Sequence, residues 1–133
     1  MKTITLCLIA LVTFSSSQAQ KNKKGTNVET TLTNHYEEYY KMMLKYNDLD
    51  GAIEGLSHLI VLSPNEAKKD TLAFMYLQAN KPIQALKVSG ESSSELALKT
   101  KAISFKNINN PKKAIENYEA LIQKNNSVVD AYE

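Results

Sequence analysis

Residues 98–121, LKTKAISFKNINNPKKAIENYEAL, decide the fold of this chain. Phe105 follows Ala102 by three residues, and the Ala114-Ile115 pair begins nine residues further on. A small residue allows two antiparallel helices to approach closely, and a large apolar residue one turn along the first helix fills the space beside it. The stretch therefore predicts a helix–turn–helix unit.

The same spacing occurs twice more, earlier in the chain. The offset is 33 residues from Ala52 to Ala85 and 29 residues from Ala85 to Ala114. Self-similarity at such a period is typical of repeat proteins, in which each unit is one supersecondary element. The matching residues are Tyr40, Met43, Ala52 and Ile53 in the first copy, and Ala73, Tyr76, Ala85 and Leu86 in the second.

Capping and turn residues set the expected helix bounds. No segment shows sustained two-residue alternation between hairpin turns, so we expect no strands and an all-α fold. Capping-box patterns start at Asn34, Ser63 and Ser92, and Asn110 stands before Pro111 at a further helix start. The expected helices span residues 34–46, 51–62, 65–79, 82–89, 94–107 and 111–124.

These three units resemble the tetratricopeptide repeat family, whose unit of about 34 residues is a helix–turn–helix. The resemblance implies an α-solenoid of about three repeats, at 34–64, 65–93 and 94–126, with the start of a fourth at 127–133. The second copy is short, because its second helix ends at Gly90. The residues that carry the resemblance are Leu98, Ala102, Phe105, Ala114, Ile115, Tyr118 and Leu121 in the third copy, and Tyr36, Met43, Ala52, Ile53, Leu56, Leu59 and Pro64 in the first.

The resemblance implies a non-enzymatic protein–protein interaction scaffold that binds a protein or peptide partner in a concave groove lined by the first helices. An alternative is that Phe74, Leu77 and Ile103 are core residues at helical spacing. The basic clamp that binds a C-terminal carboxylate in some family members is not reproduced, so we do not expect binding of such tails. The implied groove residues are Glu37, Lys41, Leu44, Lys45, Asp70, Phe74, Leu77, Gln78, Lys99, Ile103, Lys106 and Asn107.

Composition argues against several other functions. The 16 basic residues are all lysines, the formal net charge is only +2, and arginine, the usual residue for phosphate and guanine recognition, is missing, so we expect no nucleic-acid binding. The chain has no HExxH, phosphate-binding loop or GxSxG motif. We therefore expect no enzyme activity, no cofactor and no metal; a hydrolase that uses His35 or His58 is a weaker alternative.

The first 19 residues have the features of a secretory signal peptide. Lys2 precedes an apolar run up to Phe14, and small residues at Ser17 and Ala19 predict cleavage between Ala19 and Gln20. A retained membrane anchor is the alternative, but a spanning helix needs about 20 apolar residues. We expect an exported protein of a bacterium, periplasmic or secreted, with no integral membrane segment after cleavage. Residues 20–33 are polar, and we expect them to form a flexible lead-in.

The last predicted helix lacks a polar capping partner. Ile115, Tyr118 and Ile122 would have little to cover them, whereas repeat arrays normally end in a polar-faced helix. Residues 128–133, VVDAYE, resemble the start of a further repeat. Three explanations stay open: continuation into a larger protein, dimerisation through this face, or a fold-back of the last residues. An alternative function is thus a self-associating structural or adaptor segment at the N-terminus of a larger multidomain protein.

Overall fold

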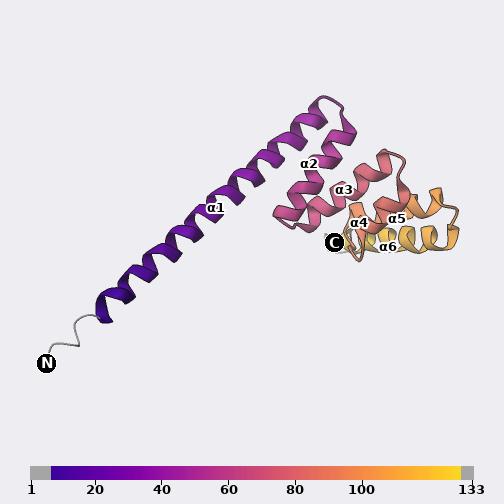
Figure 1. The fold of residues 1–133 in the computed structure, drawn as a ribbon. Helices are drawn as coiled ribbons and strands as arrows, with labels where there is room; N and C mark the ends of the chain where they lie inside the picture. The colour runs from indigo at the N-terminus through magenta and orange to yellow at the C-terminus, as the bar shows by residue number, and fades with distance from the viewer. Residues whose placement is uncertain (1–6, 130–133) are drawn as a thin grey trace. The chain divides into compact units, whose positions relative to one another are not determined.

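The computed structural model describes residues 7–129, and over that range it consists of helices joined by short turns and loops, without strands (Figure 1). Its contacts divide the chain into two units, residues 1–35 and residues 36–133. The second unit holds the helical repeats, and the all-α prediction is confirmed for the described residues. The six helices are α1 (Cys7–Lys45), α2 (Leu49–Leu62), α3 (Glu66–Gln78), α4 (Pro82–Ser89), α5 (Glu95–Asn107) and α6 (Pro111–Val129).

Helix α1 differs from two expectations drawn from the sequence. Residues 20–33 are helical instead of forming a flexible lead-in, and Asn34 lies inside the helix instead of capping its start. No proline interrupts residues 7–45, and the Thr31 and Thr33 hydroxyls donate to the carbonyls four residues earlier in the helix, at 2.7 and 2.8 Å. The first six residues of the signal peptide predicted at 1–19 lie outside the described residues.

The three helix pairs share one turn geometry. Asn47, Asn80 and Asn109 have φ angles of 56°, 57° and 59°, the left-handed conformation that ends many helices. In each turn, the backbone N–H of the residue after the asparagine donates to the carbonyl of the large residue in the repeat pattern. These bonds are Asp48 to Met43 at 2.9 Å, Lys81 to Tyr76 at 2.8 Å and Asn110 to Phe105 at 2.8 Å. The repeat spacing in the sequence is therefore a repeat of structure.

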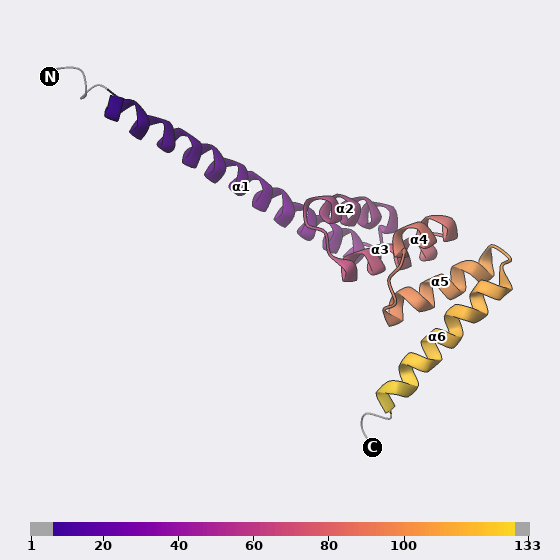
Figure 2. The same cartoon turned by 90° about the horizontal axis from the view of Figure 1, so that it is seen from below.

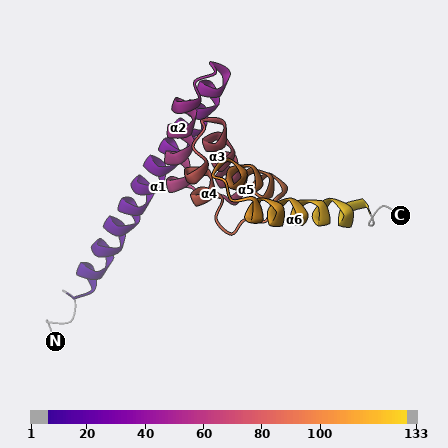
Figure 3. The same cartoon turned by 90° about the vertical axis from the view of Figure 1, so that its right-hand side faces the viewer.

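Small residues form the contacts between paired helices. The alanines that begin the second helices, Ala52, Ala85 and Ala114, are buried, as are Ala73 and Ala102 on the first helices. Helices α3 and α4 pack together, as do α5 and α6, and α4 packs on α5 (Figures 2 and 3). In the first pair, Leu56 and Leu59 of α2 are fully buried beside side chains of α1. Burial of these apolar residues provides most of the favourable free energy.

Two helix starts lie two residues later than the capping patterns predicted. Asn65 caps α3 instead of Ser63, and Ser94 caps α5 instead of Ser92. The Asn110 side chain accepts from the Lys113 N–H at 3.3 Å, as the Asn-Pro pattern predicted for α6. Several serines and asparagines compete at each start, and the side chain that reaches the third N–H of the helix becomes the cap.

Helices α4 and α6 differ sharply in length. Helix α4 has only eight residues and is followed by Gly90, with φ at 46°. Helix α6 has nineteen and continues to Val129, so the expected break at residues 124–127 and a separate partial repeat starting at 127 are not seen. No proline or glycine interrupts α6 after its first residue. Residues 130–133 lie outside the described part of the chain.

Candidate functional site

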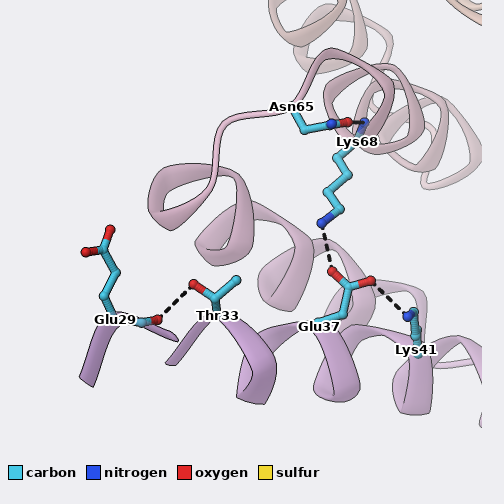
Figure 4. A network of polar contacts seen from close by, with 6 residues as sticks. All are labelled: Glu29, Thr33, Glu37, Lys41, Asn65 and Lys68. Atoms are coloured by element: carbon cyan, nitrogen blue, oxygen red, sulfur yellow. Dashed lines mark hydrogen bonds and ion pairs between the residues drawn. The ribbon is translucent and has the colours of Figure 1, made fainter. Parts of the chain in front are cut away.

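The candidate site is the set of first-helix residues on α1, α3 and α5 that the repeat pattern implied as a groove. Two of its α1 members, Glu37 and Lys41, belong to an ion-pair network that joins the first two repeats (Figure 4). The Glu37 carboxylate accepts from the Lys41 ammonium at 2.9 Å and from the Lys68 ammonium at 2.8 Å. Lys68 belongs to α3, so Glu37 ties the first helices of two successive repeats together.

The electrostatics of this network follow from those two bonds. Hydrogen bonds from Lys41 and Lys68 hold the pKa of the Glu37 carboxyl below its ordinary value of 4.5. In return, the hydrogen bond to Glu37 raises the pKa of the exposed Lys41 ammonium. The two shifts favour an ionised Glu37 carboxylate and a charged Lys41 ammonium.

Asp70 does not lie in an open groove. It is only 4% exposed, and its Oδ2 accepts from the hydroxyls of Ser92 at 3.0 Å and Ser94 at 2.6 Å. The Ser94 hydroxyl oxygen also accepts from the Ala97 N–H at 3.0 Å and so caps α5. Asp70 thus fixes the loop between the second and third repeats, and it is not accessible to a partner.

The apolar members of the set divide into two kinds. Phe74, Leu77 and Ile103 are half-buried, so each contributes to packing and keeps part of its surface open. Leu44 is 43% exposed and lines a shallow hollow together with Gln78. Asn47 and Leu49 complete that hollow, which brings groove residues of α1 and α3 to one place.

The remaining members are exposed polar residues. Lys41 and Lys45 lie on α1, and Lys99, Lys106 and Asn107 lie on α5. Of these five, only Lys41 has an ion-pair partner within the described residues. The exposed part of the site therefore contains one large apolar side chain, Leu44, and four lysines.

The contacts of three residues that organise this region were not predicted from the sequence. No contact was predicted for Lys68, although its separation of about one repeat from Glu37 could have suggested a bridge between first helices. Ser92 was considered only as a cap, and no role was predicted for the Ser94 hydroxyl. No local pattern predicts that a loop serine meets an aspartate twenty-two or twenty-four residues earlier, since that contact depends on the packing of α5 on α3.

The two histidines and the predicted cleavage pair are not members of the candidate groove. The His58 ring is exposed and stacks on Tyr36 with the ring centres 4.8 Å apart, and His35 is exposed on α1. Across the described residues, no three histidine, cysteine or acidic side chains are grouped closely enough to hold a metal ion. Ala19 and Gln20, the predicted cleavage pair, lie within α1.

The comparisons with known proteins give no further guide. No protein-family model matches the chain, and no curated protein matches it at a significant level. Over residues 7–129, none of the helices is both long enough and apolar enough to cross a membrane.

Proposed function

We propose that the chain is a non-enzymatic binding scaffold of tetratricopeptide type, which holds a polypeptide partner against α1, α3 and α5. The observation that carries the proposal is the repeated helix pair with its three equivalent asparagine turns. Stacked helix pairs of this kind leave the first helices on one extended surface, the usual place for partner binding in such arrays. The partner is an extended or helical segment with apolar anchors for Leu44 and the half-buried Phe74, Leu77 and Ile103, and with carboxylates for the surrounding lysines.

The test is selection of peptides from a random display library, followed by binding measurements with the best sequences. Enriched peptides should combine apolar residues with aspartate or glutamate. Simultaneous reversal of four lysines to glutamate should abolish binding without loss of helicity by circular dichroism. The four reversed residues are Lys41, Lys45, Lys99 and Lys106.

A matched control reverses four lysines outside the candidate groove. Each set contains one lysine with an ion pair, Lys41 to Glu37 in the test set and Lys81 to Asp50 in the control set. Undiminished binding by the test variant would refute the groove. The control residues are Lys81, Lys112, Lys113 and Lys124, all exposed and associated with the second helices.

Export is a separate part of the proposal. The signal-peptide pattern of residues 1–19 supports cleavage between Ala19 and Gln20 and a periplasmic or secreted location. The intact mass of the protein recovered from its own cells tests it: a chain that begins at Gln20 is the expected result. A chain that retains Met1 would contradict the proposal.

The α6 surface supports a second candidate function, self-association. Ile115, Tyr118 and Ile122 lie on one face of α6 and are 56%, 37% and 57% exposed. Two of their equivalents in the first repeat, Ile53 and Leu56, are buried, and the third, Ile60, is half-buried. Ile122→Glu should then reduce the mass measured by analytical ultracentrifugation. A chain that is monomeric with and without the substitution would exclude this function.

A further inference from the structure

A hollow lies beside the end of α4, where the second repeat is shorter than the others. Ser89, the last residue of α4, corresponds to Leu56 of α2, 33 positions earlier, as Asn80 corresponds to Asn47. Helix α2 continues beyond that point to Leu62, so the second repeat lacks its last helical turns. The space beside the end of α4 remains open, with a volume of about 450 Å³.

The other two repeats place the same pair of residues in the missing turn. Leu59-Ile60 in α2 and Leu121-Ile122 in α6 are 62 positions apart, the same separation as the turn residues Asn47 and Asn109. In the first repeat Leu59 is fully buried and Ile60 is half-buried. The site left vacant in the second repeat is therefore suited to a leucine–isoleucine pair or side chains of similar size.

The lining of the hollow agrees with such an occupant. Its apolar part consists of Ile60 of α2, Leu72 of α3 and Val88 of α4. Leu72 is 5% exposed and the other two are half-buried, so an apolar occupant would extend the existing core. The volume is in the range of pockets that bind small ligands, about 300–1,000 Å³.

Charged residues on the rim define the polar part of the occupant. The Lys69 ammonium forms an ion pair with the Glu66 carboxylate, with 2.7 Å between Nζ and Oε1. Within the described residues, the Lys87 ammonium and the Glu91 carboxylate have no ion-pair or hydrogen-bond partner. A carboxylate on the occupant would be favoured beside Lys87 and disfavoured beside Glu91, which fixes the direction in which the occupant lies.

We propose that this hollow binds one turn of an amphipathic helix from another polypeptide, with two adjacent aliphatic side chains on Ile60, Leu72 and Val88 and a carboxylate beside Lys87. The bound turn replaces the one that α4 lacks. The hollow shares no residue with the candidate groove, so the two sites can be tested independently.

The probe is a synthetic stapled helical peptide, blocked at both ends, with one Leu-Ile pair and one glutamate a turn before it. Two control peptides carry Ser-Ser in place of Leu-Ile, or lysine in place of glutamate. Binding is measured by fluorescence anisotropy, and its location by amide chemical-shift changes. The expected result is saturable binding of the first peptide alone, with shifts at Lys87, Val88 and Gly90.

Two protein variants and their matched controls locate the contacts. Val88→Phe fills the hollow and should abolish saturable binding, whereas Ile83→Phe, at a 68% exposed position on the same helix, should leave it unchanged. Lys87→Glu should weaken binding about fivefold or more, and the lysine peptide should restore it. Lys112→Glu on α6 is the control for charge.

Several results would overturn the proposal. Equal binding by Lys87→Glu and the unchanged protein would do so, as would absence of saturable binding or shifts confined to the candidate-groove residues of α1, α3 and α5. Self-association of the unchanged chain that Val88→Phe abolishes would assign the hollow to a second copy instead. If Val88→Phe does not fold, the Lys87→Glu variant and its rescue decide the question. The variant with the four groove lysines reversed should bind this peptide normally. Its binding therefore shows whether the hollow proposal and the groove proposal fail separately.

Discussion

Gly55 of α2 lies in a close contact between the two helices of the first pair, and Gly55→Ala tests that contact. A Cβ atom at this position would lie 2.7 Å from Tyr39 Cδ1, 3.0 Å from Tyr40 Cβ and 3.2 Å from Tyr40 Cα. The Tyr39 ring can turn aside, but Tyr40 Cα belongs to the α1 backbone. An added methyl group therefore forces the two helices apart.

Two opposing terms give the expected size of the effect. Replacement of glycine by alanine inside a helix stabilises the folded state by about 0.5–1 kcal/mol. An extra methyl group in a tightly packed contact costs about 1–3 kcal/mol. We expect a net loss of about 1 kcal/mol in the free energy of unfolding, which lowers the melting temperature of a domain of this size by about 4–8 °C.

Urea and thermal unfolding, followed by far-ultraviolet circular dichroism, measure this change. Gly25→Ala is the matched control, because it places the same methyl group on α1 with no atom within 4 Å, so only the helix-forming gain remains. We expect Gly25→Ala to be neutral or stabilising. If Gly55→Ala proves as stable as the unchanged chain, α1 and α2 do not approach as closely as the structure indicates.

Three further predictions concern polar contacts and one turn. Asp70→Ala removes hydrogen bonds from two loop serines to a buried carboxylate and should cost about 1.5–3 kcal/mol by urea unfolding, whereas Asp50→Ala at an exposed ion pair should cost about 0.5 kcal/mol or less. Lys41 and Lys68 lower the pKa of Glu37 in the folded state. The stability that Glu37 provides is therefore present above pH 4.5 and is lost as the pH falls through its pKa in the folded state. Glu37→Gln should reduce the free energy of unfolding by roughly 0.2–1 kcal/mol at neutral pH and leave it unchanged at pH values well below 4.5. Asn80→Ala puts a Cβ-bearing residue without a turn-favouring side chain at a φ of 57° and should lose about 1 kcal/mol, whereas Asn80→Gly should be close to neutral in thermal unfolding.

The repeat architecture could be predicted because its determinants are local and occur three times. Each unit needs a small residue where the helices meet, a large one a turn away and a residue that tolerates the left-handed turn. The sequence contains all three at constant spacing. The helix α4, at Pro82–Ser89, has the bounds expected from the sequence, because Pro82 and Gly90 mark its ends directly.

The continuity of α1 could not be predicted by the same means. Asn34 followed by Glu37 is a good capping pattern, but a cap forms only where the preceding chain leaves the helix. Residues 20–33 contain no proline to force that departure, and threonine hydroxyls can bond to the helix's own carbonyls. Glu37, moreover, pairs with Lys68, a contact that exists only after α3 packs on the first pair.

The candidate groove could be predicted as a set of positions but not as a surface. Family positions are assigned by alignment, whereas exposure depends on which neighbouring side chains fill the space. Asp70 shows the difference, because the short α4 brings the loop serines onto its carboxylate and buries it. Leu44 shows the opposite outcome, since it lies near the turn of the first pair and keeps 43% of its surface.

The early end of α4 explains both the buried polar network and the hollow. Without its last turns, the second repeat cannot cover the start of α5 with apolar side chains. The chain instead attaches the following loop through Asp70 and through Lys101, whose ammonium donates to the Ser92 carbonyl at 2.7 Å. These bonds fix the loop, but they provide no apolar side chains for the space beside Val88. Polar contacts can therefore maintain the order of the repeats while the hollow stays open to a helical turn from a partner.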